Sequence, residues 1–114
     1  PSKPGQCVFL AREKGIIAGM AILFTGLDDL AGGEAKLGFG VRSACQGRGI
    51  GRALVENALE HARASGVTRV VAEVLPHNLA AIGLLLTASF SIVTLGEPAH
   101  EPMACALFER RLRE

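Results

Sequence analysis

The feature that most constrains this chain is a change of hydrophobic period on either side of a glycine-rich turn. In the segment 35–41 apolar residues alternate with small or charged ones, which is typical of a strand. After Gly49 the apolar residues recur at helical spacing, and Ser65-Gly66 supplies a C-terminal stop. The pattern therefore predicts that a strand runs through a short turn, residues 43–47, directly into a helix.

The remaining segments extend this unit into a single sheet with two helices. Residues rich in strand formers predict further strands at 7–12, 16–24, 67–75, 91–95 and 103–112, and the first two form a hairpin through Glu13-Lys14-Gly15. Asn78 is a suitable N-cap for a second helix to about Ala88, which is apolar nearly all round and is expected to be buried. The order β-β-β-α-β-α-β-β predicts an α+β fold with a mixed α/β sheet, in one domain over residues 1–114.

Composition narrows the classes of partner. The formal net charge is +1, so no strongly basic surface favours nucleic acid or an anionic membrane. Cys7, Cys45 and Cys105 are far apart and form no CxxC spacing, which indicates free thiols in a reducing cytoplasm rather than disulfides or a metal site. We therefore expect a cytoplasmic protein that holds no metal.

The turn itself has the chemistry of a phosphate site. The N-terminus of a helix presents free N–H groups and the positive end of the helix dipole, and Gly47, Gly49 and Gly51 let an anion approach the backbone. Arg48 and Arg52 add positive charge. The glycines also fit a plain tight turn, because Gly is the usual residue there. A dinucleotide-binding G-x-G-x-x-G is not present, since Arg52 stands at its third glycine, and no P-loop pattern occurs.

The pattern that does fit is Q-x-x-G-x-G, formed by Gln46, Gly49 and Gly51. Here the chain resembles the GNAT superfamily of acyl-coenzyme A-dependent N-acyltransferases. The resemblance continues through the strand 67–75 and the helix segment that contains Asn78, Ala81, Ile82 and Phe90. The run 69–78 is also similar to bacterial protein lysine acetyltransferases of the Pat type.

The resemblance implies that acetyl-CoA is the co-substrate and assigns roles to residues of the turn and its neighbours. Phe39, Gly40 and Val41 would lie along the pantetheine arm of coenzyme A, and Asn78 would lie near its sulfur. The residues around the pyrophosphate would be Gln46, Gly47, Arg48, Gly49, Ile50, Gly51 and Arg52. The amides of residues 47–52 would bind the pyrophosphate. A helix N-cap is an equally good interpretation of Asn78, and the two roles are compatible.

The catalytic groups are less clear, because the chain departs from the family pattern. Lys36 stands where many members have a glutamate base, although Glu34 lies on the same face of the strand two residues earlier. Leu85 stands where many members have a tyrosine acid, and the chain contains no Tyr. Glu73 and His77 are further candidates for proton transfer. A solvent-facing carboxylate explains Glu73 as well.

Three further expectations concern the whole protein. His100 and Glu101, in a Pro-rich loop, are candidates for the rim of the acceptor site. The family's usual first strand and two helices are not seen in this sequence, so either they lie in a missing segment or another subunit supplies that wall of the acceptor site. We expect a homodimer, in which a second copy completes the sheet or the acceptor wall. The resemblance implies a bacterial N-acetyltransferase that acts on a small amine or a protein lysine. An acyl-CoA-binding module without catalysis is the alternative, and an unrelated nucleotide-binding domain is a third.

Overall fold

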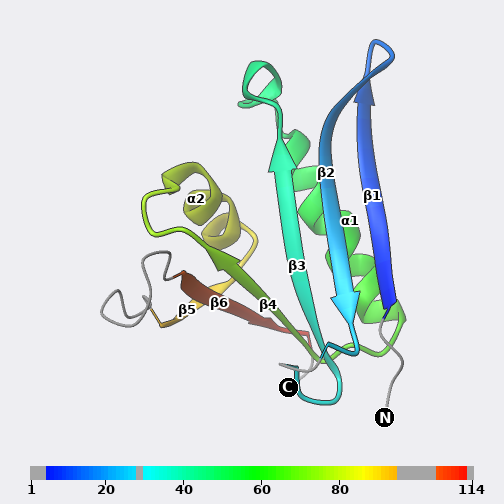
Figure 1. Ribbon diagram of the computed structural model, residues 1–114, viewed down its shortest axis with the longest axis vertical. Helices are drawn as coiled ribbons and strands as arrows, with labels where there is room; N and C mark the ends of the chain where they lie inside the picture. The colour runs from blue at the N-terminus through cyan, green and yellow to red at the C-terminus, as the bar shows by residue number, and fades with distance from the viewer. Residues whose placement is uncertain (1–4, 28–29, 95–104, 113–114) are drawn as a thin grey trace.

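The chain forms one mixed six-stranded sheet with two α-helices (Figure 1). The structure is a computed structural model, and it describes residues 5–27, 30–94 and 105–112. The elements in chain order are β1 (Gly5–Glu13), β2 (Ile16–Thr25), β3 (Glu34–Val41), a 3-10 turn (Ser43–Cys45), α1 (Ile50–Ala64), β4 (Arg69–Val74), α2 (Leu79–Thr87), β5 (Ser91–Thr94) and β6 (Ala106–Arg111). The sheet order is β1-β2-β3-β4-β6-β5.

Strands β3 and β4 are parallel to each other, and this pair determines where the site can form. Their ladder contains only the pairs Glu34–Arg69, Ala35–Val70 and Lys36–Val71. Beyond Lys36 the two strands diverge, so that β3 continues with β2 while β4 turns away with β6 (Figure 1). The sheet is thus split at its centre, and α1 and α2 begin at the open end of the split.

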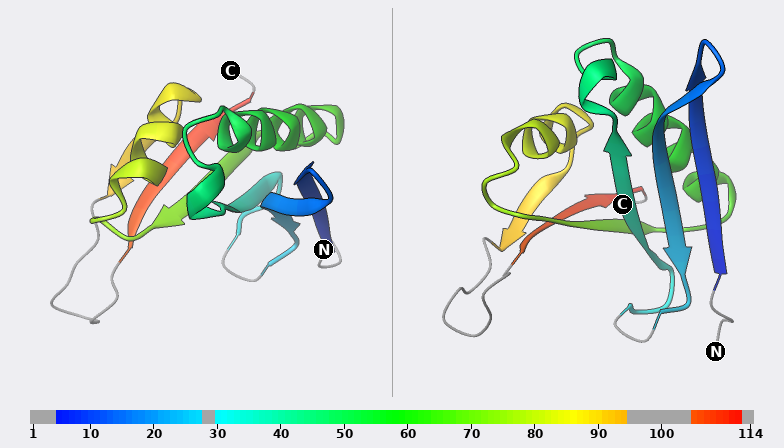
Figure 2. Two further views of the ribbon diagram at one scale, coloured as in Figure 1. Left: turned by 90° about the horizontal axis from the view of Figure 1, so that it is seen from above. Right: turned by 45° about the horizontal axis from the view of Figure 1, so that its top comes forward.

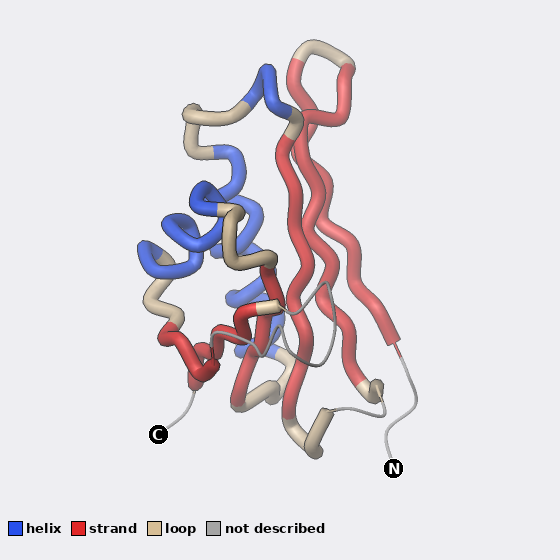
Figure 3. Tube along the Cα trace, turned by 60° about the vertical axis from the view of Figure 1, so that its left-hand side comes forward, coloured by secondary structure: helices blue, strands red, loops and turns tan. Residues whose placement is uncertain are grey.

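Both helices lie over the same face of the sheet (Figure 2). Their apolar sides share one core with that face, which includes Val55 and Leu59 of α1, Leu85 of α2, Leu37 of β3 and Phe108 of β6. Helix α1 runs behind β1, β2 and β3, with all of the helical segments on one side of these strands (Figure 3). The opposite side of the sheet carries no helix in the described part of the chain, and we call it the open face.

The expected order of elements and the mixed sheet are confirmed, with boundaries shifted by a few residues. The expected turn at 43–47 contains a short 3-10 helix. The prediction that α2 is buried is wrong: Leu79 is 74% exposed and Leu86 is 49% exposed. Only Ala81 and Leu85 within the helix are buried, because α2 contacts the core along one side alone. The loop with His100 and Glu101 lies outside the described residues.

Candidate functional site

A cleft of about 420 Å³ lies at the open end of the split between β3 and β4. It is bounded by the end of β3, the glycine-rich turn, the first turn of α1 and the start of α2. The lining residues are Phe39, Gly40, Val41, Cys45, Gln46, Gly47, Gly49, Ile50, Gly51, Arg52, Asn78, Ala80, Ala81 and Leu84. The structure thus brings every predicted coenzyme A residue except Arg48 into the wall of one cavity. Its volume is within the range of ordinary small-molecule sites.

The N-terminus of α1 forms the anion-binding end of this cleft. Gly49 is the N-cap residue with φ of 80°, and Gly47 has φ of 83°, both in the left-handed region that favours glycine. The amides of the first helical turn have no acceptor within the helix. The first turn contains no acidic residue, so no carboxylate offsets the positive end of the helix dipole.

Side-chain hydrogen bonds hold the chain between β3 and α1 in place. The side-chain amide of Gln46 donates from Nε2 to the carbonyl oxygen of Val41 at 3.2 Å, which closes the turn on itself. Arg42 donates from Nε to the carbonyl oxygen of Ile17 at 2.7 Å, and its amide donates to Ala18 at 2.8 Å. The turn is therefore attached to β2 as well as to β3. The Gln of the sequence pattern acts here by shaping the turn.

The two arginines beside the glycines are each paired with a carboxylate. Arg48 bonds with Glu13 at the end of β1, and Arg52 bonds with Glu56 at 3.2 Å, one turn further along α1. Both guanidinium side chains are more than half exposed. Such exposed pairs contribute little stability, so either guanidinium can exchange its carboxylate for a phosphate. Arg52 lines the cleft, whereas Arg48 lies beside it.

Asn78 caps α2 at the opposite wall of the cleft. Its Oδ1 accepts a hydrogen bond from the amide of Ala81 at 3.2 Å, which confirms the predicted N-cap. The side-chain nitrogen, Nδ2, carries two further N–H donors. Because Asn78 also lines the cavity, one side chain can cap the helix and still donate to a ligand.

Lys36 and Glu73 face each other across the point where β3 and β4 separate. Leu37 of β3 and Ala72 of β4 belong to the core, so the neighbouring side chains of Lys36 and Glu73 project from the open face. Lys36 Nζ lies 3.0 Å from a carboxylate oxygen of Glu73. The Lys36 side chain is 23% exposed and that of Glu73 is 50% exposed. The predicted base thus lies at the apex of the split, outside the cleft lining.

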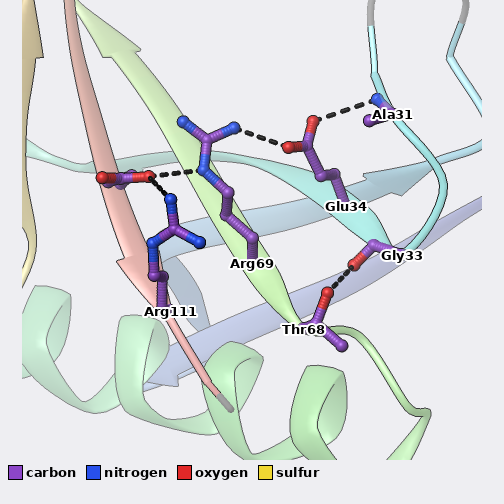
Figure 4. A network of polar contacts seen from close by, with 7 residues as sticks. Ala31, Gly33, Glu34, Thr68, Arg69 and Arg111 are labelled. Carbon is purple, nitrogen blue, oxygen red and sulfur yellow. Dashed lines mark hydrogen bonds and ion pairs between the residues drawn. The ribbon is translucent and has the colours of Figure 1, made fainter. Parts of the chain in front are cut away.

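Glu34 belongs to a different cluster, at the far end of the β3–β4 ladder (Figure 4). Its carboxylate accepts hydrogen bonds from the amide of Ala31 at 3.0 Å and from Arg69 at 2.6 Å, and Arg69 also bonds with Glu109 of β6. The hydrogen bond from Ala31, with a further contribution from Arg69, lowers the pKa of Glu34 below its ordinary value. The pKa of Arg69 is raised, mainly by Glu109. This cluster joins three strands.

The other predicted proton carriers lie apart from the cleft lining. His77 is exposed in the turn that precedes α2. Leu85, which stands at the family's usual tyrosine position, is fully buried in the core. Its neighbour Leu84 lines the cleft instead. Sequence reasoning did not single out Cys45, Ala80 and Leu84 as cleft residues. The helical spacing of Ala80, Ala81 and Leu84 after the cap at Asn78 was the available signal for the second wall.

Among the described residues, no group of three or more His, Cys, Asp or Glu side chains is arranged to hold a metal ion. No helix in the described part of the chain is both long and apolar enough to cross a membrane.

The chain is similar to known proteins over most of its length. Residues 2–90 match the model of the acetyltransferase (GNAT) family. The chain is 36% identical over 88 residues to the mycothiol acetyltransferase of Beutenbergia cavernae, an alignment that includes 77% of this chain and 29% of that protein. The chain therefore spans less than a third of the length of this relative.

Solved structures show the same fold. A putative acetyltransferase from Salmonella typhimurium, solved with its cofactor acetyl-CoA, matches with a TM-score of 0.79 and 25% identity, over 96% of this chain and 66% of that chain. The GNAT domain of PAT from S. lividans matches with a TM-score of 0.74 and 27% identity, over 94% of this chain and 61% of that chain.

Proposed function

Because the chain belongs to the acetyltransferase (GNAT) family, we propose that it transfers an acetyl group from acetyl-CoA directly to a primary amine of a small molecule or a protein lysine. The observation that carries the proposal is the single cleft formed by the end of β3, the N-terminus of α1 and Asn78. Its two ends match the two halves of the donor, since the helix N-terminus suits the pyrophosphate and the strand edge suits the pantetheine arm.

The edge of β3 supports the second half of that match. Beyond Lys36 no pair of the β3–β4 ladder is formed, so the backbone from Phe39 to Val41 offers its N–H and C=O groups toward the split. An amide-containing arm can bind such an edge in the manner of an added strand. A backbone N–H on this edge would also stabilise negative charge on the thioester oxygen during attack by the amine.

Among the three predicted catalytic residues, Glu73 is the one we assign as general base. Glu73 lies on the open face at the apex of the split, and its carboxylate already forms an ion pair with the Lys36 ammonium at 3.0 Å. Glu34 is held by Ala31 and Arg69, and its lowered pKa makes it a weaker base. His77 remains an exposed candidate at the start of α2. The acceptor amine would approach Glu73 from the open face.

The alternative is an acyl-CoA-binding module without catalysis of its own. Leu85 favours it, because this buried side chain has no proton to give to a thiolate leaving group. The ion pair with Lys36 favours it too, since an acceptor amine must displace an ammonium from Glu73. Acetyl-CoA binding without turnover of any acceptor would select this alternative.

Calorimetric titration with acetyl-CoA, followed by measurement of free thiol release, tests the proposal. Binding together with thiol release in the presence of a panel of amines and lysine peptides is the expected result. If the intact protein does not bind acetyl-CoA, both the acetyltransferase proposal and the binding-module alternative are ruled out. A matched pair of variants, Gly49→Val in the turn and Gly15→Val in the β1–β2 hairpin, separates loss of the site from general strain, because both glycines have positive φ and no atom within 4 Å of an added Cβ.

The proposal also covers the location of the protein in the cell, its oligomeric state and its partners. Cys7, Cys45 and Cys105 form no disulfide, which is consistent with a reducing compartment, and the cytoplasm of a bacterium is the one proposed here. The single GNAT-like domain at 1–114 would act as a homodimer on an amine acceptor, with neither nucleic acid nor membrane as a ligand. Exposed Leu10 and Met20 on the open face of the outer strands support pairing with a second copy. A monomer in sedimentation at high concentration would exclude the dimer.

A further inference from the structure

The amine of Lys36 occupies the place that the acceptor amine of the proposed reaction would take. Lys36 Nζ lies 3.0 Å from the Glu73 carboxylate, which is the distance at which a general base receives a proton from its substrate. Lys36 is also the last residue of β3 in the ladder with β4, so its side chain lies where the split begins. Lys36 and the end of β3 that lines the cleft therefore lie along one strand, and the carboxylate of Glu73 reaches Lys36 from the neighbouring strand β4.

Among the described residues, no side chain lies close above Gly38 and Gly40 on the open face of β3, between Lys36 and the cleft. Gly38 and Gly40 follow Lys36 on this face, since the alternate residues Leu37 and Phe39 pack with the core. A Cβ added at either glycine would meet no atom within 4 Å. Gly40 itself lines the cleft, about 13 Å along the strand from Lys36 at roughly 3.3 Å per residue. The long, flexible four-carbon stem of Lys36 would have to cross this bare stretch to meet the acetyl end of a donor bound in the cleft.

We propose that Lys36 is itself an acetyl acceptor, modified by acetyl-CoA bound to the same chain with Glu73 as the base. The inference rests on the proposed function, because it uses the same donor site. It adds an acceptor that is present in every copy of the protein.

The chemistry balances without any further reactant. Glu73 takes one proton from the Lys36 ammonium, and the neutral Nζ attacks the thioester carbon. The N–C bond forms as the C–S bond breaks, and the second proton lost by the nitrogen converts the leaving thiolate to free coenzyme A thiol. Glu73 then returns its proton to solvent. The product amide carries no charge, so the ion pair ends and Glu73 becomes available to an external amine.

Quantitative peptide mass spectrometry of the intact chain incubated with acetyl-CoA tests the inference. Lys14 is the internal control, because it is exposed in the β1–β2 turn and reacts by chemical acetylation alone. We expect Lys36 to gain its acetyl group at least about tenfold faster than Lys14, at a rate that does not change when the protein is diluted. Glu73→Gln should slow Lys36 about 100-fold, the order that a general base contributes. Lys36→Arg should remove the modified peptide and confirm its assignment.

A second variant keeps the test decisive if Glu73→Gln disturbs the sheet. Gly38→Val adds a side chain to the bare stretch at a position outside the cleft lining, where a Cβ has open space, and it should block acetylation of Lys36 while the thermal shift with acetyl-CoA persists. Equal rates at Lys36 and Lys14, or a rate that falls on dilution, would overturn the inference. If external amines still release thiol in that case, the proposed function stands; absence of both binding and thiol release would instead overturn the proposed function.

Discussion

Gly51 of α1 lies directly against Leu84 of α2: a Cβ added to Gly51 would come within 3.0 Å of Leu84 Cδ2 and within 3.3 Å of Val41 Cγ2. The last glycine of the turn pattern therefore has a packing role, because it lets α1, α2 and the end of β3 meet at the base of the cleft. Gly47 and Gly49 differ from it, since their positions require positive φ and leave open space for a Cβ.

The first prediction concerns this contact. Gly51→Val should lower the free energy of unfolding by about 2 kcal/mol, the usual effect of overpacking, and should abolish the rise in Tm with acetyl-CoA. Gly83→Ala is the matched control, because this helix glycine has open space around it and should gain up to about 1 kcal/mol. Urea unfolding measures both. A Gly51→Val protein as stable as the parent would contradict the packing role.

The second prediction concerns the backbone of the turn. Gly49→Ala should cost about 1 kcal/mol through its left-handed φ alone, since the new Cβ meets no other atom. Gly49→Asn should cost less, because Asn tolerates this conformation better. If urea unfolding ranks Ala above Asn at this position, strain in φ is not the reason for the glycine.

The third prediction separates the cleft from the fold. Gly40→Val should leave the Tm of the free protein unchanged or higher, because the strand has room for the side chain and valine favours strands. The same variant should lose the rise in Tm with acetyl-CoA, since Gly40 lines the cleft. Gly38→Val, outside the lining, is the control that should keep the rise. Retained binding by Gly40→Val would place the donor elsewhere.

The fourth prediction concerns acid stability. The folded-state pKa of Glu34 lies below its unfolded value, so its contribution is present above the unfolded pKa and is lost as the pH falls through the folded pKa. Glu34→Gln should therefore be less stable than the parent at neutral pH, and the difference should shrink on acidification. Urea unfolding over roughly pH 3 to 7 measures it. A difference that is constant with pH would mean that the charge of the Glu34 carboxylate contributes nothing to stability, through Ala31 or through Arg69.

Local patterns in the sequence were enough to predict the order of the elements and most of the residues that line the cleft. The turn, the strand before it and the cap at Asn78 are each specified by residues close in sequence, and the fold brings them together. The contact between Lys36 and Glu73 joins residues from two strands whose ladder stops after three pairs, and no local pattern specifies that length. The pairing of Arg48 with Glu13 is equally long-range.

Helix α2 shows that a local pattern can also predict too much burial. Its composition predicts burial all round, yet Leu79 is largely exposed because a helix at this position meets the core along one side. Apolar residues indicate what a helix is able to bury, and the arrangement of the sheet decides what it does bury. The two candidate carboxylates show a related limit: Glu34 and Glu73 look alike in sequence, and only their partners in the fold distinguish them.

The last prediction separates the two roles of Asn78. Asn78→Ala removes the hydrogen bond to the amide of Ala81 and should lower the free energy of unfolding by about 1 kcal/mol. Asn78→Asp keeps an oxygen that caps the helix, so its stability should equal that of the parent, but it replaces the Nδ2 donor by a carboxylate oxygen. If Nδ2 donates to the bound donor, Asn78→Asp should weaken acetyl-CoA binding in calorimetry while urea unfolding is unchanged. Equal affinity in the Asp variant would limit Asn78 to the helix cap, because the affinity would then not depend on the side-chain nitrogen.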